Sequence, residues 1–502
     1  MGRRRLTADL LAGLSVAVVA IPQALAYADL AGMPPVRGLY ATALPPLVAA
    51  IFASSPYLQT GPVAITSLLT FGALSTQAQP GSDEYVALGL ALALIVGVTR
   101  IALGLLRAGP VAYLMSQPML LGFVPAAALI IIATQVPEAL GSAAPAGSPV
   151  EEAAWALAHP GSWGPAALAV SAAALILVLG GRRLHPLLPG VLLAAALGML
   201  ATTLFGHPTA TVGEIPEGLP PISLALPWSD LPGLALPGVV IALVGFSEAA
   251  SISRRFASEE RSRWKPNREF VSQGMANVTA AFSGGFPCGG SFSRSALNRV
   301  TGARTRLSGA VTGLAVVAFL PFASVLEPLP TAVLGAILIA AVLPLVRLTP
   351  LVSLWRLSRP QFLIAAATFT ATLVSTPRVE RGLLVGVGLS MLVFIWRMLR
   401  LDIGVTVDDD TLELRPRGVL WFATSQRLED ALVDGIADQP QVRGVCLDLA
   451  GVGRVDTTGA LAIQAILADA RRSGLATRVV NPPPGSRALA EALSRDFRPA
   501  GP

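Results

Sequence analysis

Apolar runs long enough to cross a membrane recur along most of this 502-residue chain, and they constrain its fold more than any other feature. They begin near Leu6 and end near Leu399, after which the charge density rises and the runs stop. Hydrophobic residues make up 53% of the chain and charged residues 13%, which excludes a soluble globular enzyme of this length. We therefore expect a membrane-embedded transport domain, residues 1–402, followed by a small soluble domain, residues 403–502.

The membrane part divides into two sets of seven predicted spans, which makes fourteen. The first set lies near residues 6–28, 36–53, 62–77, 85–106, 110–134, 164–180 and 187–205. The second set lies near residues 236–256, 267–284, 291–301, 306–326, 329–346, 360–376 and 381–399. The basic start of the chain leads into the first span without a clear cleavage site, which indicates a helix rather than a signal peptide.

The loop charges favour an even number of spans with both termini in the cytoplasm, because cytoplasmic loops are enriched in Arg and Lys. The loops expected inside are basic, with Arg107, Arg182, Arg183, Arg254, Arg255, Arg261, Arg263, Lys265, Arg268, Arg304, Arg306, Arg347, Arg356 and Arg359. Residues 138–163 and 206–235 contain acids but no basic residue, so both are expected outside. Only Arg37, Arg378 and Arg381 break the pattern. The basic residues behind the net charge of +6 are thus explained by the orientation of the loops across the lipid bilayer. Nucleic acid is not an expected partner.

Glycine and proline interrupt the membrane part at two places that are seven spans apart. An extended stretch ends at Gly61-Pro62, and Pro62 is expected at the first position of a helix that begins inside the membrane. Residues 284–290 are too flexible for a helix, and Ser291 is placed to cap a second short helix. This spacing is typical of two inverted seven-span repeats with a binding site at their interface. Ordinary helix kinks are the alternative interpretation.

Two half-helices that meet near the midplane present unpaired backbone N–H groups to the space between them, and this attracts anions. Arg294 lies inside the second short segment and is placed to hold a carboxylate or sulfate oxygen. The alternatives are that Arg294 snorkels to the interface or pairs with an acid.

The first and eighth spans flank this predicted site. In the first span, a proline break at Pro22 stands next to Gln23 and Tyr27, which share a helix face and are available to a ligand. In the eighth span, Glu248 is an acid inside the membrane, which is costly if it is ionised and unpaired. One hypothesis is that Glu248 binds a proton, or helps to bind sodium, together with the anion. The other is that it is a permanent counter-ion to Arg294.

These segments resemble the sulfate permease (SulP, solute carrier 26) family of anion transporters over the whole chain. The marks of the resemblance are residues 21–28, 36–42, 61–64 and 293–295, together with the soluble tail. The resemblance implies a seven-plus-seven inverted-repeat fold, shared with nucleobase transporters, in which a core of spans one to four and eight to eleven moves against a gate. It also implies a homodimer in a bacterial inner membrane.

The resemblance further implies a substrate site between the starts of spans three and ten, with Glu248 nearby. The residues that it assigns to the substrate are Gln23, Tyr27, Val63, Ala64, Phe292, Ser293 and Arg294. The expected function is proton-coupled symport of a small anion: a C4-dicarboxylate such as fumarate, sulfate or bicarbonate. A sodium-coupled bicarbonate symporter and an uncoupled channel or uniporter are the alternatives. The coupling ion is H+ or Na+, and no other cofactor and no metal is expected.

The soluble tail alternates strand and helix patterns, which predicts a small α/β domain. Strands are expected at residues 403–407, 412–415, 418–423 and 442–449, with a helix from Ser425 and another ending near Arg472. Residues 455–459 resemble the turn of STAS domains (sulfate transporter and anti-sigma antagonist), which implies assembly or a cytoplasmic regulator. We expect Asp456 to cap the second helix and Thr458 to pack in its first turn; regulatory phosphorylation of Thr458 is the alternative.

Other classes of function fit less well. A receptor would need an output motif, which the sequence lacks, and an enzyme would need a nucleophile–base pair or a metal cluster. A nucleobase transporter of the same fold would leave Arg294 unexplained. Two cysteines and three histidines offer neither a disulfide framework nor metal-ligand spacing.

Overall fold

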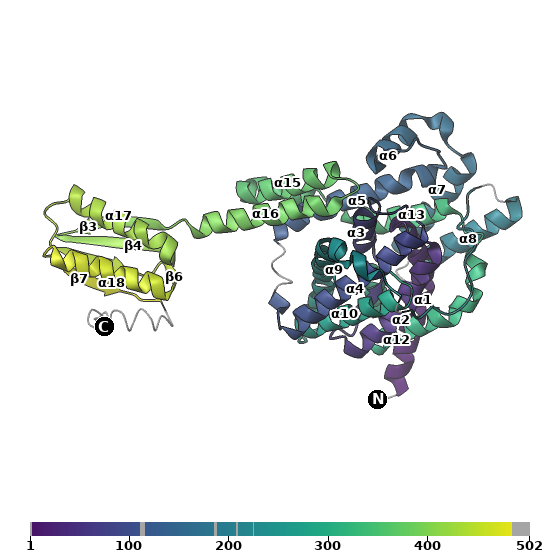
Figure 1. Cartoon of the computed structure of the whole chain (residues 1–502), viewed down its shortest axis with the longest axis horizontal. Helices are drawn as coiled ribbons and strands as arrows, with labels where there is room; N and C mark the ends of the chain where they lie inside the picture. Colours follow the sequence, from purple (N-terminus) through teal and green to yellow (C-terminus); the bar gives the residue numbers. More distant parts are fainter. Residues whose placement is uncertain (1–2, 111–115, 185–187, 207–208, 224, 484–502) are drawn as a thin grey trace. The chain divides into compact units, whose positions relative to one another are not determined.

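The computed structural model describes residues 3–110, 116–184, 188–206, 209–223 and 225–483. Its packing separates two compact units, Met1–Val387 and Gly388–Pro502 (Figure 1). The first unit is helical apart from two three-residue strands, and the second combines helices with a sheet. The division falls inside a helix, Val379–Met398, and the domain boundary after residue 402 stays a prediction.

The first half of the helical unit runs from α1 to α8. Its elements are α1 (Arg3–Leu30), α2 (Pro35–Phe52), β1 (Gln59–Gly61), α3 (Ala64–Leu74), α4 (Asp83–Leu105), α5 (Gln117–Leu140), α6 (Pro149–Ala158), the 3-10 turn η2 (Pro160–Ser162), α7 (Pro165–Leu184) and α8 (Gly190–Phe205).

The second half runs from η3 to α16. Its elements are η3 (Trp228–Asp230), α9 (Leu231–Glu259), α10 (Pro266–Phe282), β2 (Gly289–Ser291), α11 (Phe292–Val300), α12 (Leu307–Phe319), η4 (Leu320–Leu326), α13 (Thr331–Val342), η5 (Leu343–Leu345), α14 (Thr349–Leu357), α15 (Arg359–Val374) and α16 (Val379–Met398).

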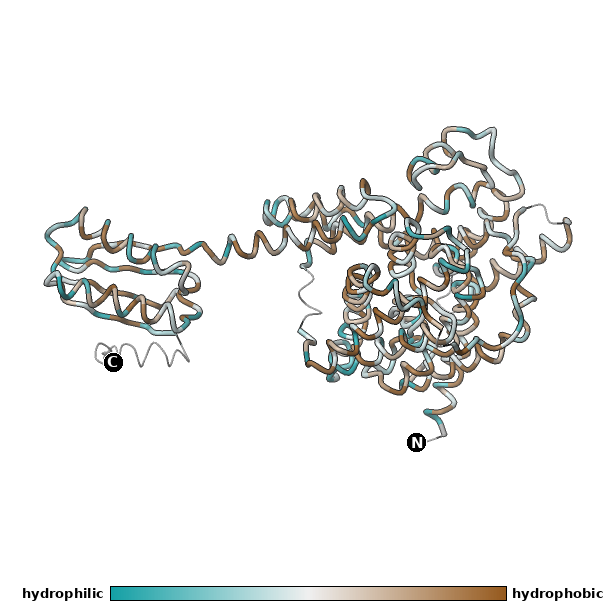
Figure 2. The backbone as a smooth tube through the Cα atoms, viewed as in Figure 1, coloured by the Kyte–Doolittle hydropathy of each residue, from teal (hydrophilic) through white to brown (hydrophobic). Residues whose placement is uncertain are grey.

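A helix lies at each predicted span, although the fifth begins at Gln117 and residues 111–115 lie outside the described residues. The short helices α6 and α14 were not predicted. Eight helical segments of the described chain are long and apolar enough to cross a membrane, and α3, α7 and α8 are shorter apolar helices. Figure 2 shows hydrophobic residues over most of the helical unit. The count of fourteen crossings stays a prediction.

Two predictions about proline were wrong. Pro22 lies inside α1 and does not break it, because the helix continues through Leu30 while packed against α2 and α12. Pro62 is not the first residue of α3, because Val63 is the N-cap and the helix begins at Ala64. The carbonyl of Pro62 instead accepts a hydrogen bond from Arg294, which holds the chain extended up to the cap.

The helices of the first unit pack in two sets. In one set, α4 packs on α10 and α9, α2 packs on α10 and α12, and α1 packs on α2 and α12. In the other set, α5 packs on α13 and α15, and α7 packs on α8 and α13. We call the first set, α1–α4 with α9–α12, the core and the second set the gate. The half-helices α3 and α11 belong to the core, and both contact α1.

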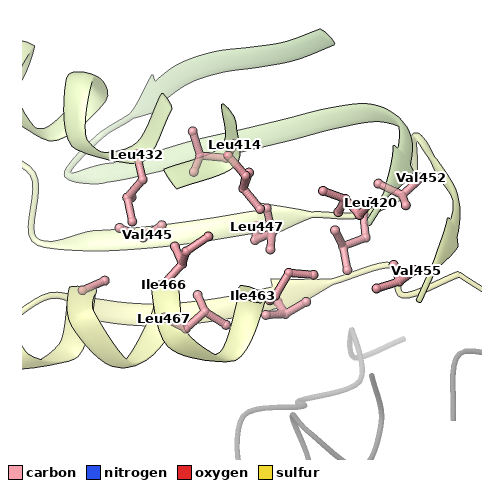
Figure 3. Close-up of a cluster of buried hydrophobic side chains, with 14 of the residues drawn as sticks. Leu414, Leu420, Leu432, Val445, Leu447, Val452, Val455, Ile463, Ile466 and Leu467 are labelled. Atoms are coloured by element: carbon pink, nitrogen blue, oxygen red, sulfur yellow. The ribbon is translucent and has the colours of Figure 1, made fainter. Parts of the chain in front are cut away.

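The described part of the tail, up to residue 483, is a five-stranded sheet with two helices. Its elements are β3 (Asp402–Asp408), β4 (Thr411–Leu420), α17 (Phe422–Asp438), β5 (Gly444–Asp448), β6 (Val452–Val455), α18 (Thr457–Arg472) and β7 (Ala476–Val480). The strand order is β3-β4-β5-β7. β3 and β4 are antiparallel, whereas β4 pairs in parallel with β5, and β5 pairs in parallel with β7. β6 pairs in parallel with the C-terminal end of β4. Leucine, isoleucine and valine side chains from β4, β5, α17 and α18 fill its interior (Figure 3).

Three details of the predicted tail were wrong. The strands expected at residues 412–415 and 418–423 are a single strand, β4, because Leu412, Leu414 and Leu420 all face the same core. The helix expected from Ser425 begins at Phe422, where the side chain of Thr424 bonds the backbone at Trp421. Strands β6 and β7 were not predicted.

Candidate anion site

The two half-helices begin side by side because the extended stretches before them pair with each other. β1 and β2 form an antiparallel ladder with Gln59 opposite Ser291 and Gly61 opposite Gly289. α3 starts after Val63, and α11 starts after Ser291, whose hydroxyl accepts a hydrogen bond from the Arg294 N–H. The predicted Ser291 cap is therefore present. The free N–H groups of both first turns and the positive ends of both helix dipoles lie next to this ladder.

Arg294 joins the two half-helices. Its side chain is buried, and Nη2 donates to the carbonyl of Pro62 at 2.6 Å. Gly61 has a φ of +152°, and a Cβ there would lie 2.9 Å from Arg294 Nη1, so both backbone conformation and space require glycine. A second cross-link runs from the Gln59 N–H to Ser295 Oγ at 2.9 Å. The positive charge of Arg294 is thus fixed directly beside the two helix starts.

A second buried arginine, which the sequence analysis did not single out, supports the turn before β2. Arg100 of α4 donates to the carbonyls of Ala242, Ile241 and Cys288 at 3.0, 3.3 and 2.8 Å. Asn277 of α10 holds the same turn, because its side chain donates to the Cys288 carbonyl at 3.0 Å and accepts from the Cys288 N–H at 2.8 Å. The backbone of β2 is thereby anchored to α4, α9 and α10.

Buried polar residues on one face of α10 were also missed. Glu269, Gln273 and Asn277 are spaced four apart and are all fully buried. Glu269 accepts from the N–H groups of Ser54 and Ser55, and Gln273 donates to the Thr60 hydroxyl at 2.7 Å. The sequence alone offers this spacing inside a predicted span as a signal, and it also offers Arg100, which is the one charged residue of α4 beyond its acidic first turn.

A cavity of about 850 Å³ lies between the core and the gate. Among the described residues, the polar lining comes from the core: Ser15, Gln23, Tyr27, Glu248, Ser291, Ser293 and Thr301. The gate residues that line it within the described ranges are apolar, namely Val178, Leu188, Pro189, Gly190, Val191, Ala341, Val342, Pro344 and Leu345. The cavity extends along α1 from Tyr27 to Leu11 and along α11 to its end at Val300. It therefore reaches from the helix starts toward the N-terminal end of α1.

The predicted site residues come together here. Those that line the cavity are Gln23, Tyr27, Val63, Ala64, Glu248, Phe292 and Ser293. Arg294 does not line it but lies behind the helix starts, on the Pro62 carbonyl. In this conformation Arg294 acts on the cavity through its charge and through the position of the two half-helices.

Glu248 faces the cavity from the middle of α9. Its Oε2 is buried and has no hydrogen-bond partner among the described residues. No ion pair within 4.0 Å joins Glu248 to Arg294 in the described part of the chain, and the guanidinium is bonded to a carbonyl instead. A direct permanent salt bridge between the two is therefore absent from this conformation. A buried carboxylate oxygen without a partner is a place where a proton lowers the cost of burial.

The tail places its predicted residues at the start of α18. Asp456 is the N-cap, as predicted, and its Oδ1 accepts from the Gly459 N–H at 2.6 Å. Thr458 lies in the first turn but is exposed, so the expectation that it packs there was wrong: it faces solvent on the open side of the helix. Burial raises the pKa of the Cys446 thiol in β5. Among the described residues, no cluster of His, Cys, Asp and Glu could hold a metal ion.

Comparison with family models gives two matches that together cover most of the chain. Residues 6–368 match the model of the sulfate permease family, and residues 402–497 match the STAS domain.

Relatives of similar sequence carry names of sulfate transporters. The chloroplastic sulfate transporter 4.1 of Arabidopsis thaliana is 34% identical over 76% of this chain and 57% of its own length. A probable sulfate transporter of Mycobacterium tuberculosis is 35% identical over 79% of this chain and 71% of its own. The sodium-independent sulfate anion transporter of Bos taurus is 30% identical over 93% of this chain and 82% of its own length. The chain thus spans less than two thirds of the length of the plant relative.

Solved structures share the fold. The murine solute carrier 26 family member A9 anion transporter, in its inward-facing state, superposes with a TM-score of 0.87 at 21% identity, over 99% of this chain and 88% of that one. The transmembrane domain of the cyanobacterial bicarbonate transporter BicA superposes with a TM-score of 0.66 at 26% identity, over 77% of this chain and 99% of that one.

Proposed function

Because the chain belongs to the sulfate permease family of anion transporters, we propose that it carries a small dianion across the membrane by alternating access, with a proton. The cargo is sulfate or a C4-dicarboxylate such as fumarate. The observation that carries this proposal is the convergence of two half-helix N-termini and the buried Arg294 beside one cavity.

The electrostatics of the site favour a dianion. Each helix start contributes about half a positive charge and several free N–H donors, and Arg294 contributes a full charge. A tetrahedral sulfate or a carboxylate accepts several such donors at once, while Gln23 and Ser293 offer further polar contacts from the same wall. The described residues of the opposite wall are apolar, so the anion is held by the core.

This division of chemistry supports movement of the core against the gate. An apolar wall makes no hydrogen bonds that would have to break when the core slides with its bound anion. The cavity reaches toward the N-terminal end of α1, which is the cytoplasmic side in the proposed orientation with both termini inside. The conformation is then inward-facing.

Glu248 is the proposed site of proton coupling. An anion bound beside an ionised Glu248 would be repelled, whereas a protonated Glu248 removes this repulsion. Proton and anion then bind together and cross together. The name of the bovine relative, a sodium-independent transporter, supports a proton over sodium as the coupling ion.

Bicarbonate with sodium is the second candidate. It is favoured by the superposition on the transmembrane domain of a bicarbonate transporter. An uncoupled channel or uniporter would use the same charges. We further propose a homodimer in a bacterial inner membrane, with the STAS domain as the site of assembly or of a cytoplasmic regulator.

Uptake into proteoliposomes tests the proposal. Labelled sulfate, fumarate and bicarbonate are offered in turn, under an imposed pH gradient and separately under a sodium gradient. Accumulation of sulfate or fumarate above equilibrium, driven by protons, is the expected result. Accumulation of bicarbonate driven by sodium would establish the second candidate, and flux that only follows the anion gradient would contradict coupling.

A further inference from the structure

A second hollow continues the line of the main cavity. It has a volume of about 610 Å³ and is lined by Arg4, Arg5, Ala8, Tyr57, Gly302 and Arg304. On α1, residues three or four apart line the two hollows in sequence, and they form one face of the helix: Arg4, Ala8, Leu11, Ser15, Val19, Gln23 and Tyr27. The chain passes from one hollow to the other at the end of α11 as well. Val300 and Thr301 line the main cavity, and Gly302 and Arg304 line the second hollow. The second hollow therefore lies at the mouth of the first.

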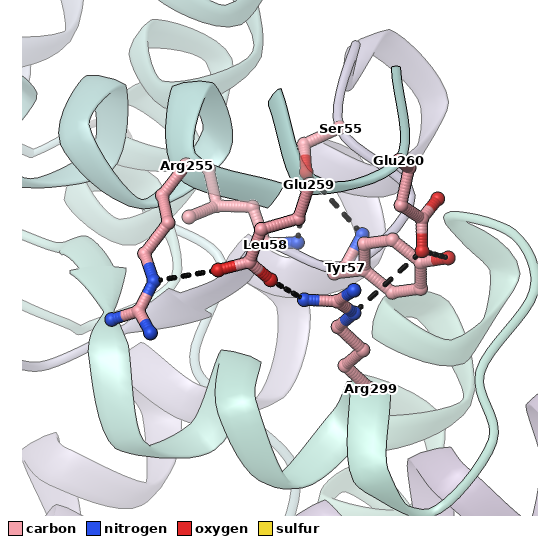
Figure 4. A network of polar contacts seen from close by, with 7 residues as sticks. All are labelled: Ser55, Tyr57, Leu58, Arg255, Glu259, Glu260 and Arg299. Carbon is pink, nitrogen blue, oxygen red and sulfur yellow. Dashed lines mark hydrogen bonds and ion pairs between the residues drawn. The ribbon is translucent and has the colours of Figure 1, made fainter. Parts of the chain in front are cut away.

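The positive charge in this hollow is not compensated by an ion pair. The neighbouring Arg299 pairs with Glu259 and Glu260, and Arg255 pairs with Glu259 at 2.9 Å (Figure 4). The hydroxyl of Tyr57 donates to Glu260 Oε1 at 2.5 Å, so the nearby acids are already engaged. Within the described residues, no carboxylate forms an ion pair within 4.0 Å with the guanidinium of Arg4, Arg5 or Arg304.

The backbone that carries these arginines is held in place by a buried acid. Asp9 is fully buried, and its Oδ1 accepts from the N–H groups of Arg304 and Thr305 at 2.7 and 2.9 Å. Its Oδ2 accepts from the Thr305 hydroxyl at 2.6 Å. Because Asp9 belongs to α1, it ties the turn with Arg304 to the helix with Arg4 and Arg5. The backbone that carries the three arginines is thereby held around one hollow.

We propose that Arg4, Arg5 and Arg304 form an anion-capture site, where a divalent oxyanion binds before it passes along α1 to the half-helices. The inference rests on the proposed function, because it assumes that the main cavity carries an anion. Three cations at a cavity mouth raise the local concentration of a dianion and its rate of entry. These arginines lower the KM for an anion that enters from this face. The rate at saturating anion concentration is set by the inner site. The phosphate of an anionic lipid headgroup has the same chemistry and is the competing source of the oxyanion.

The transport test uses the triple variant R4Q/R5Q/R304Q and a control, R261Q/R263Q/R356Q, which removes the same charge from three exposed residues elsewhere. Vesicles of neutral phosphatidylcholine are captured on an N-terminal affinity tag, so that the face with Arg4 is outside. The triple variant is expected to raise the KM for labelled sulfate about fivefold at low ionic strength. The KM of the unmodified protein should rise toward this value as salt increases. An unchanged KM, or the same rise in the control, would overturn the inference.

The lipid source is separated by repeating the assay with phosphatidylglycerol in the vesicles. If substrate is the occupant, the difference in KM between the protein and its triple variant persists. If the difference is present in neutral vesicles but vanishes in anionic ones, a headgroup displaces the substrate from the hollow, and substrate capture in an anionic membrane is overturned.

Equilibrium binding of labelled sulfate to the purified full-length chain needs no transport. Two sites are expected in the unmodified protein and one in the triple variant. A single site in both would overturn the capture site even if transport stands, and two sites without any transport would instead contradict the proposed function.

Discussion

The two walls of the transport cavity differ in chemistry although they enclose the same space. In the part of the chain that the structure describes, the core wall carries the polar lining side chains, including Gln23, Tyr27 and Glu248, while the gate wall presents residues such as Val191 and Val342. The core wall is also cross-linked behind its surface by buried arginines that bond backbone carbonyls. Polar lining and buried cross-links thus lie on the same side of the cavity, which supports the proposed movement of the core against the gate.

The largest effect is expected where the scaffold of the core is broken. Arg100→Met removes three buried hydrogen bonds, although the Cys288 carbonyl keeps the one from Asn277, and we expect the free energy of unfolding to fall by about 3 kcal/mol. Thermal unfolding of the purified protein measures this, with the exposed Arg356→Met as the control. An equal melting temperature for both variants would contradict the scaffold role of Arg100.

The next largest effect is expected at Arg294. Arg294→Gln removes the fixed charge behind the helix starts, and uptake of sulfate should fall about 30-fold, since a charge-assisted interaction contributes about 2 kcal/mol. Arg294→Lys keeps the charge but not the geometry of the guanidinium, so it separates the two roles. If Arg294→Lys retains uptake, the positive charge is the property of Arg294 that transport requires. If Lys fails as Gln does while both variants stay folded, the bond to Pro62 decides, and the electrostatic account of the core wall is wrong.

A smaller loss of transport is expected for a substitution of Glu248. This substitution separates proton coupling from anion binding. Glu248→Gln mimics the protonated side chain, so sulfate exchange should continue at equal pH on both sides. Accumulation driven by an imposed pH gradient should fall about tenfold, to the level set by the anion gradient alone. Parallel measurements of exchange and accumulation check this. Accumulation equal to that of the unmodified protein would exclude Glu248 as the coupling residue.

The smallest change in transport is expected when one lining side chain of each wall is shortened. Gln23→Ala removes a polar contact from the core, and the KM for sulfate should rise about fivefold. Val191→Ala trims the gate wall, and the KM should change less than twofold, because no hydrogen bond is lost there. Initial rates of uptake over a range of sulfate concentrations measure both. A larger change for Val191→Ala would show that the gate takes part in recognition.

Much of the helical unit can be predicted from local sequence. The apolar runs place a helix at each predicted span, and the two glycine–proline interruptions locate α3 and α11, because irregular backbone inside a membrane must be satisfied by protein or water. Residue type alone also singles out Gln23, Tyr27 and Glu248, which the fold brings to one cavity. The supporting residues escape such reasoning, since Arg100 and Asn277 meet Cys288 across 188 and 11 positions of sequence.

The sequence by itself determined which segments cross apolar surroundings and where their backbone is interrupted, because hydropathy and the limits of Gly and Pro act locally. Only the tertiary structure decided that β1 and β2 pair, that Arg294 lies behind the helix starts and not in the cavity lining, and that three arginines line one hollow. Those outcomes depend on contacts between distant residues, such as Asp9 with Thr305, whose geometry is set by packing and not by the neighbours of either residue.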